Sequence, residues 1–302
     1  MNKPRRAPRR RVDGVLLLDK PTGMSSNAAL QKARWLFNAA KAGHTGTLDP
    51  LATGLLPLCF GEATKFSGEL LDAGKAYLAT VRLGIVTDSA DADGTVLETR
   101  PVAVTEAEAR AVLVRFAGEI EQVPPMHSAL KREGVPLYEL ARRGIEVERA
   151  PRRVTIRTLT LSNWAGDRFD LLVDCSKGTY VRTLAADIGA ALGCGAHLTA
   201  LRRTRVGPLD LADAVTLADI EALAPERRDS LLSPPDGLLA ELPLVRLDAA
   251  AAERMLHGQP VRWNGVAGQR CRLHGPQGFI GMGELRPDGF LHAKRLVADG
   301  NN

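Results

Sequence analysis

The sequence lacks any apolar run long enough to cross a membrane. None of its uninterrupted apolar segments approaches the roughly 20 residues that a membrane-spanning helix needs. Near the N-terminus, the apolar run at residues 14–18 is too short for the core of a signal peptide and is ended by Asp19. We therefore expect a cytoplasmic protein that has no contact with membranes.

Cysteines and histidines are few, and neither type is clustered. The four cysteines lie far apart without a C-x-x-C pair, and the six histidines show no metal-ligand spacing. These spacings argue against a zinc site and against a disulfide framework. We expect no metal, and we expect the thiols to be buried, namely Cys59, Cys175, Cys194 and Cys271.

The short motifs of several enzyme classes are also missing. The chain has no P-loop, no G-x-G-x-x-G after a strand, no H-E-x-x-H and no G-x-S-x-G. Nucleotide-driven, redox, zinc and serine-hydrolase chemistry thereby lose their usual markers. What remains is a reaction without a cofactor, carried out by a carboxylate and a few polar partners.

Excess positive charge is confined to the N-terminus. The net charge is +5, but six basic residues precede the first acid, Asp13, so the remainder of the chain is close to neutral. We expect residues 1–11 to form a disordered basic tail. Such a tail serves solubility or attracts phosphates without sequence preference.

The most distinctive stretch that is present covers residues 43–61, with four glycines, two prolines and one carboxylate, Asp49. Glycine and proline at this density exclude a regular helix through its first half. Asp49 precedes an apolar run, and a carboxylate near buried surface is costly unless it is paired, and is often functional. A local alternative is that Asp49 caps a helix whose first residue is Pro50.

Hydrophobic periodicity predicts a mixed α/β fold with mainly antiparallel strand pairing. The length of 302 residues suggests one large domain and a smaller one, and from about residue 243 short strands with Gly-rich turns predict a small β-barrel-like unit. The acidic turn at 88–94 is interpreted as a hairpin loop. The main strands are expected at 12–20, 75–85, 154–161, 169–175 and 197–206, and the helices at 26–37, 62–71, 105–118, 136–143, 180–191 and 216–224.

Several segments resemble the motifs of bacterial TruB-type tRNA pseudouridine-55 synthases, a family of pseudouridine synthases. They occur in the family's order over about residues 12–210, and the resemblance of residues 243–302 to the family's PUA-type barrel is looser. The segments are D-K-P-T-G-M-S-S at 19–26, G-H-T-G-T-L-D-P-L-A-T-G-L-L-P at 43–57, G-K-A-Y at 74–77, P-P-M-H-S-A-L-K at 124–131, C-S-K-G-T-Y-V-R at 175–182 and L-R-R-T at 201–204.

The resemblance implies a fold and an activity. The fold would be α/β mixed (α+β), with a mainly antiparallel central sheet flanked by helices and a small C-terminal PUA-like β-barrel. Residues 12–242 would form the catalytic domain, with an RNA-contacting insert at about 123–150, and residues 243–302 a PUA-like RNA-binding domain. The enzyme would isomerise uridine to pseudouridine at position 55 in the T loop of tRNA by base flipping, without a cofactor.

The same resemblance implies roles for single residues. Asp49 would be the nucleophile, adding to the uracil ring or to the sugar carbon, which the sequence leaves open. Arg182 matches the family position that keeps this carboxylate ionised, although an arginine taken alone would be a solvent-facing helix residue. Tyr77 would stack on the flipped base and assist proton removal at C5, Tyr180 would line the pocket and Leu201 would close it.

Further residues would support the site or bind RNA. His44 would help to extrude the uridine or fill the space that it leaves, and Lys20 would brace the active-site loops. Phosphate contacts are expected from basic residues in and after the insert, although several of them can belong to a solvated face. These residues are Lys131, Arg132, Arg142, Arg143, Arg149, Arg152 and Arg153.

The implied partner is tRNA, bound through its T stem-loop, with contacts to the acceptor stem left open. The full insert and the compact C-terminal part favour an enzyme that needs no protein partner, and we expect a monomer. Two alternatives remain. One is an RNA-binding folding factor that opens and refolds the tRNA elbow, with modification secondary. The other is a related synthase that acts on another RNA with a guide or partner.

Overall fold

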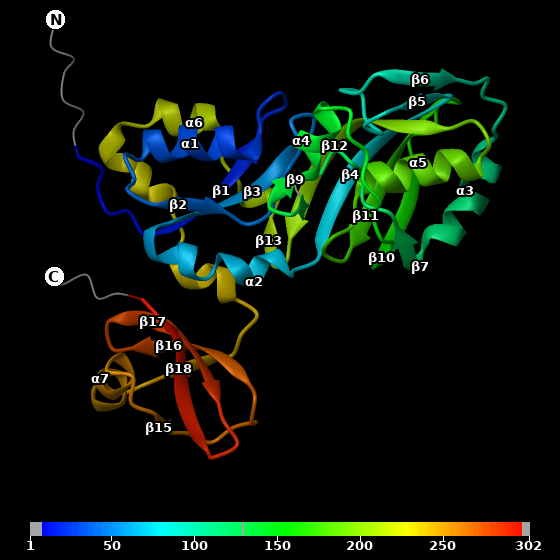
Figure 1. The fold of residues 1–302 in the computed structure, drawn as a ribbon. Coiled ribbons are helices and arrows are strands. Elements are labelled where there is room, and N and C mark those ends of the chain that lie inside the picture. Colours follow the sequence, from blue (N-terminus) through cyan, green and yellow to red (C-terminus); the bar gives the residue numbers. More distant parts are fainter. Residues whose placement is uncertain (1–7, 129, 298–302) are drawn as a thin grey trace, which may run out of the picture.

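The computed structural model describes residues 8–128 and 130–297, and Figure 1 shows a large α/β part with a smaller unit of short strands beside it. The helices are α1 (Ser26–Leu36), α2 (Ser67–Leu71), α3 (Glu106–Leu113), α4 (Leu137–Arg142), α5 (Val181–Ala191), α6 (Leu217–Ala222) and α7 (Ala249–Leu256), with short 3-10 helices η1 (Gly61–Lys65), η2 (Val114–Phe116), η3 (Leu211–Asp213), η4 (Pro225–Leu231) and η5 (Pro235–Leu239).

The strands belong to two larger sheets and two short ribbons. Those of the large part are β1 (Gly14–Lys20), β2 (Ala42–His44), β3 (Thr53–Phe60), β4 (Lys75–Leu83), β5 (Ile85–Thr87), β6 (Val96–Thr99), β7 (Gly118–Gln122), β8 (Lys131–Arg132), β9 (Val135–Pro136), β10 (Arg152–Ser162), β11 (Arg168–Cys175), β12 (Ala196–Val206) and β13 (Leu209–Asp210). Those of the smaller unit are β14 (Leu244–Arg246), β15 (Val261–Arg262), β16 (Arg270–Gly275), β17 (Gly278–Leu285) and β18 (Phe290–Leu296).

One sheet organises the large part, in the order β1-β3-β12-β4-β11-β10-β7. Its neighbouring strands are antiparallel except for β3 and β12, which are parallel over a short stretch. Helices α1 and α6 pack over the β1–β3 half, whereas α3 and α5 lie beside the other half (Figure 1). The predicted mixed fold with a mainly antiparallel central sheet is thereby confirmed.

Strand β4 shows why the sequence folds in this way. Its side chains alternate strictly between buried and partly exposed, and Tyr77, Ala79, Val81 and Leu83 all face the core as expected. β4 is the middle strand of the order given above, and it pairs with both β12 and β11 along nearly its whole length. A residue on the buried face of β4 is consequently held by strands on both sides.

Helix starts were predicted better than the loops between them. The helices expected at 26–37 and 105–118 begin after side-chain caps at Ser25 and Thr105, the second of which forms a complete capping box with Glu108. By contrast, the helix expected at 62–71 is split into η1 and the short α2. The alternative in which Asp49 starts a helix is wrong, because the chain beyond it runs into strand β3, which pairs with β1.

The expected basic tail at residues 1–11 falls mostly outside the described residues, since residues 1–7 are not described. Its last part has defined contacts with the body of the protein. Arg10 donates to the carbonyl of Phe37 at 3.0 Å, forms an ion pair with Asp229, and makes a β-bridge to Ala39. At Arg10 the chain is therefore already part of the folded body, which corrects the expected boundary at residue 11.

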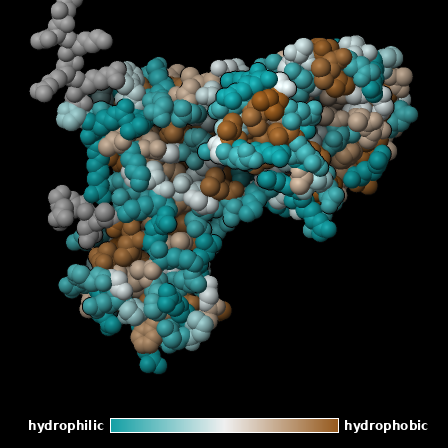
Figure 2. Space-filling model, in the orientation of Figure 1, coloured by the Kyte–Doolittle hydropathy of each residue, from teal (hydrophilic) through white to brown (hydrophobic). Residues whose placement is uncertain are grey.

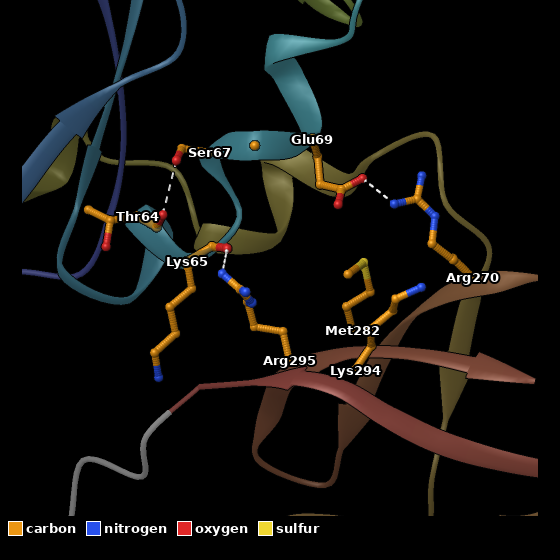
Figure 3. A pocket seen from close by; sticks show the side chains of 9 residues that line it. Thr64, Lys65, Ser67, Glu69, Arg270, Met282, Lys294 and Arg295 are labelled. Atoms are coloured by element: carbon orange, nitrogen blue, oxygen red, sulfur yellow. Dashed lines mark hydrogen bonds and ion pairs between the residues drawn. The ribbon is translucent and has the colours of Figure 1, made fainter. Parts of the chain in front are cut away.

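The smaller unit has its own five-stranded sheet, β14-β16-β17-β18-β15, closed at one side by α7. It meets the large part at η1 and α2, where Arg270 pairs with Glu69 at 2.7 Å and Arg295 donates to the carbonyl of Lys65 at 2.8 Å (Figure 3). A cavity of about 440 Å³ lies at this junction. None of the residues predicted for the site lines it. Within the described residues, no helix is long and apolar enough to cross a membrane.

Glycine 54 is required where β3 and β12 meet. Its φ is +97°, and a Cβ atom there would lie 2.3 Å from the carbonyl oxygen of Arg203 and 2.8 Å from its nitrogen. Both are backbone atoms, so a side chain can be accommodated only if one strand moves. Gly54 thus allows the two strands to approach at the point where the sheet changes from antiparallel to parallel pairing.

Substitution of this glycine tests the close approach. Gly118→Ala is a matched control, because Gly118 also has a positive φ of +86° but open space around its Cβ position. The control should lose only about 1–2 kcal/mol of stability, which is the cost of placing alanine at a positive φ. Gly54→Ala should lower the free energy of unfolding by about 3 kcal/mol or more, because a clash with the Arg203 backbone is added to the same strain. Melting temperatures of the two full-length variants measure this, and equal losses would contradict the steric argument.

Candidate active site

The loop that carries Asp49 is held from both sides by the segment between β1 and α1. The buried hydroxyl of Ser26 accepts from the Leu48 nitrogen at 2.7 Å and donates to the Leu48 carbonyl at 2.9 Å. Gly23 donates its backbone N–H to the carbonyl of Pro50 at 2.8 Å. Because both neighbours of Asp49 are fixed, its carboxylate has a defined direction, with 38% of the side chain exposed.

Lys20 ends strand β1 and is completely buried. Its ammonium group donates to the carbonyls of Pro21 at 2.9 Å and Met24 at 2.5 Å, within the segment that holds the Asp49 loop. Burial lowers the pKa of Lys20 to about 8, the Asp49 carboxylate opposes this fall, and the Arg203 charge adds to it. These contacts tie the end of β1 to the segment that holds the Asp49 loop.

Arg182 lies in the first turn of α5 and points into the protein. Its Nε atom is 3.0 Å from Oδ2 of Asp49, and only 5% of the side chain is exposed. Nη1 donates to the carbonyl of Ser89 at 2.9 Å, and Nη2 donates to the carbonyl of His127 at 2.6 Å. The alternative of a solvent-facing arginine is therefore wrong, and three separate segments meet at this guanidinium.

Asp91 is a second carboxylate at the same guanidinium, and it was not predicted from the sequence. It is as buried as Arg182, its Oδ2 lies 3.4 Å from Nη1 of Arg182, and its Oδ1 accepts from the hydroxyl of Ser89 at 2.5 Å. The interpretation of 88–94 as a hairpin loop is correct but incomplete. Nothing in the local sequence distinguishes Asp91 from the other two aspartates of the turn, because its ion pair with Arg182 and its bridge to Leu198 in β12 join distant segments.

The charge balance at Asp49 follows from these neighbours. Burial raises the pKa of the Asp49 carboxyl above its ordinary value, the Arg182 charge lowers it, the Asp91 charge raises it and Lys20 lowers it. A carboxylate in such a position is held between a desolvating environment and a fixed cation. Perturbed groups of this kind in a partly open site are typical of catalytic centres.

Tyr77, Leu201 and Arg203 form one wall of the site. In the pairing of β4 with β12, Tyr77 stands opposite Arg203, and Ala79 stands opposite Leu201. All three side chains of the wall are buried. Arg203 was quoted only as part of the L-R-R-T segment, but alternation along the strand was a usable signal: if Leu201 faces the site, its second neighbour faces it too.

Tyr180 caps the N-terminus of α5 next to Arg182. The side-chain amide of Gln122 fixes its backbone, accepting from the Tyr180 nitrogen at 3.1 Å and donating to the Tyr180 carbonyl at 3.3 Å. Gln122 is buried and was not predicted. Burial raises the pKa of the Tyr180 hydroxyl, and the Asp49 charge contributes to the rise.

His44 is partly buried at the end of β2. Burial lowers its pKa below the ordinary value, and the charge of Arg203 lowers it further, so the imidazole is neutral at pH 7. The structure thus brings Asp49, Tyr77, Tyr180, Arg182 and Lys20 near one another and places His44 near Arg203, whereas Leu201 is located by its pairing with Ala79 on β4.

The predicted RNA-contacting residues lie apart from this pocket, on β8, α4, β10 and the loop before β10. All are exposed except Arg149, which is partly buried and pairs with Glu146. Arg142 stacks over the ring of Tyr138 at 5.5 Å, and Arg152 is near enough to Tyr180 to act on its pKa. Figure 2 shows an apolar area framed by hydrophilic residues where Figure 1 places α4.

Potential metal ligands and thiols were compared across the described residues. No group of three or more His, Cys, Asp or Glu side chains there could hold a metal ion. The four cysteines are free and buried, as predicted, and burial raises the pKa of the Cys59 thiol to about 12.

Comparison with known families matches nearly the whole chain. Residues 34–181 match "TruB family pseudouridylate synthase (N terminal domain)", residues 182–240 match "tRNA pseudouridylate synthase B C-terminal domain" and residues 243–297 match "Pseudouridine synthase II TruB, C-terminal". A protein of Aromatoleum aromaticum named tRNA pseudouridine synthase B is 60% identical over 96% of this chain and 94% of its own length. One of the same name from Chromobacterium violaceum is 56% identical over 99% of each.

Solved structures show the same fold. A chain from the crystal structure of a Cbf5–Nop10–Gar1 complex aligns with a TM-score of 0.71 at 27% identity, covering 94% of this chain and 84% of that one. A chain from an H/ACA RNP bound to a substrate RNA aligns with a TM-score of 0.72 at 23% identity, covering 95% and 86%. The arrangement of the central sheet and the C-terminal strand unit is therefore that of a known architecture.

The charge balance at Asp49 predicts two opposite shifts. Arg182→Met removes the cation that lowers the Asp49 pKa, so this pKa should rise. Asp91→Asn removes a negative neighbour, so the pKa should fall. Carbon NMR of labelled aspartate measures both, with the Asp49 signal identified by its loss in Asp49→Asn. Arg110→Met, which breaks an exposed pair with Glu106, is the control and should change nothing. Shifts of the same sign in both variants would refute the network.

Proposed function

The chain belongs to the TruB family of pseudouridine synthases and is an isomerase that converts uridine to pseudouridine in tRNA, and we propose that its target is position 55 in the T loop. The observation that carries this proposal is the Asp49–Arg182 pair at 3.0 Å, in the stretch that resembles the family's catalytic motif. The identity of 56–60% with relatives named tRNA pseudouridine synthase B supports the choice of tRNA.

We propose that Asp49 is the nucleophile. Its carboxylate adds to the uracil ring or to the sugar carbon, the N-glycosidic bond breaks, the base rotates, and a bond forms between C5 and the same sugar carbon. Either route needs an ionised carboxylate, and the Arg182 guanidinium favours that form in surroundings that otherwise raise the Asp49 pKa. The reaction consumes nothing, so none of its steps requires a cofactor.

The walls of the pocket suit a flipped base. Tyr77 offers a ring for stacking and a hydroxyl for the proton that leaves C5, Tyr180 lines the pocket beside Asp49, and Leu201 closes it. His44 is neutral at pH 7 and can fill the space that the extruded uridine leaves. Lys20 supports the loop and takes no part in the chemistry, because its ammonium is engaged by two backbone carbonyls.

We propose that the basic residues of the insert and of β10 bind the backbone of the T arm, as phosphate contacts position an RNA without reading its sequence. The chain would act as a monomer without a protein partner, since the catalytic groups and the basic residues lie on one chain. The alternative of a folding factor is not favoured, because it leaves the Asp49–Arg182 network without a purpose.

Asp49→Asn separates chemistry from binding. The amide keeps the shape of the side chain but cannot act as a nucleophile, so the variant should retain tRNA affinity and release no tritium from C5-labelled uridine in a T-arm transcript. Filter binding and tritium release on the same preparation measure the two properties. Release at near the unsubstituted rate would refute the assignment, and an unchanged T loop in tRNA from a deletion strain would refute the substrate.

The proposed backbone contacts can be tested by salt dependence. The double variant Arg142→Gln/Arg143→Gln should weaken tRNA binding and lower the slope of log affinity against log salt by about 1 for each phosphate that is no longer neutralised. The double variant Arg110→Gln/Arg115→Gln is the matched control, because it removes the same charge from exposed positions in and after α3. Equal slopes for the two variants would show that Arg142 and Arg143 only face solvent.

A further inference from the structure

Arg203 is a buried cation that the proposed reaction does not use. Only 1% of it is exposed, and in the described part of the chain it forms no ion pair with a carboxylate. Its Nε donates to the carbonyl of Leu55 at 2.7 Å, and Nη2 lies 3.4 Å from the carbonyl of Gly46. A buried charge held only by neutral oxygens is costly, so a structural role alone explains it poorly.

Two glycines of the 43–61 stretch lie against Arg203: Gly46 is at ordinary contact distance from its side chain, and Gly54 makes room for its backbone. A Cβ atom on Gly46, whose φ is +100°, would lie 3.9 Å from Nη1 of Arg203. A Cβ atom on Gly54 would collide with the Arg203 backbone. The stretch that positions Asp49 is therefore also the cradle of Arg203, and the two groups are placed by the same loop and strand.

A further neighbour of the guanidinium is Tyr77. The two residues stand directly opposite each other in the pairing of β4 and β12, on the face that lines the site, and the Tyr77 hydroxyl contacts the Arg203 guanidinium. Arginine has five donors and no acceptor. In this contact the phenol oxygen must therefore be the acceptor, and the phenol's own proton must point elsewhere.

We propose that Arg203 is a positioning residue that donates to the Tyr77 hydroxyl oxygen and thereby holds that oxygen in one place beside the site. The inference rests on the proposed function only in assigning the pocket to a uridine. The carbonyls of Leu55 and Gly46 set the guanidinium, and the guanidinium sets the phenol oxygen. Asp49 and the flipped base then meet a hydroxyl whose oxygen is held in one place.

The surrounding charges are compatible with this arrangement. Lys75 is also buried nearby, but its ammonium donates to the carbonyls of Leu71 and Ala73, away from the phenol. Burial raises the pKa of Tyr77, and the Arg203 charge opposes the rise. Among the described residues, Arg203 is thus the cation in contact with the Tyr77 oxygen, and its removal leaves that oxygen without a charged donor.

The first test is spectroscopic and needs no activity. The chain has three tyrosines, so the ring-carbon Cζ signals of the full-length protein can be assigned from single Tyr→Phe variants. Arg203→Met should shift the Tyr77 signal at pH 7 and leave those of Tyr138 and Tyr180 in place. Arg203→Lys should restore part of the shift, because a lysine can still donate. An unmoved Tyr77 signal in a folded Arg203→Met protein would overturn the proposal.

The second test uses single-turnover rates on bound T-arm RNA. Arg203→Met should slow turnover at least tenfold while leaving RNA affinity unchanged, since the side chain is buried away from solvent. In a Tyr77→Phe background, which has no hydroxyl to orient, the same substitution should slow turnover less than twofold. Arg205→Met is the matched control: Arg205 lies on the same strand but pairs with Asp174 at a partly exposed position.

The outcomes distinguish this proposal from the function itself. A tenfold loss that persists in the Tyr77→Phe background would show that Arg203 acts as a general structural brace and would overturn the proposal. If Arg203→Met does not fold, Arg203→Lys carries both tests, and a Tyr77 signal and rate equal to those of the unsubstituted protein would support the donor role. Failure of the proposed function would appear instead as tritium release by Asp49→Asn.

Discussion

The ion pair between Asp49 and Arg182 is the interaction on which the arrangement of the site depends. A carboxylate that is partly removed from water has a raised pKa, and a guanidinium removed from water needs acceptors. Each group therefore stabilises the charged form of the other, but neither could be placed by its neighbours in sequence. The loop before β3 supplies the carboxylate, and the first turn of α5 supplies the cation. The strands between them set the distance.

Much of this was visible in the sequence, for identifiable reasons. Alternation in β4 placed Tyr77 on the buried face, and side-chain caps at Ser25 and Thr105 fixed two helix starts, because both signals are local. Asp49, Arg182 and Tyr180 came from the resemblance of whole motifs. Without that resemblance, the Asp-Pro pair would have been interpreted as a helix start with Asp49 as its cap, and Arg182 as a solvent-facing helix residue. The structure excludes both of these interpretations, since β3 follows the Asp49 loop and α5 turns Arg182 inward.

What the sequence could not supply are the residues whose role depends on contacts between distant segments. Asp91 is one aspartate of three in a turn, and its ion pair with Arg182 and its bridge to β12 separate it from the others. Gln122 is a polar residue at the end of β7, and only the approach of α5 gives it a backbone to bind. Arg203 lies in a basic segment of the sequence, and no neighbouring residue indicates its contacts with Leu55, Gly46 and Tyr77. In each case, pairing between strands or between a strand and a helix creates the contact, and such pairing is not encoded in local periodicity.

The guanidinium of Arg182 has a consequence for how the protein acquires its activity during folding. It donates to Asp49, to Ser89 in the hairpin turn and to His127 near the start of the insert. Ser89 lies 93 residues before Arg182 in the chain, and His127 lies 55 residues before it. Contacts at such separations form late, because the chain must first close long loops. Helices and hairpins can form while these ends are still apart. A partly folded chain with its helices already in place would therefore be inert toward its RNA substrate.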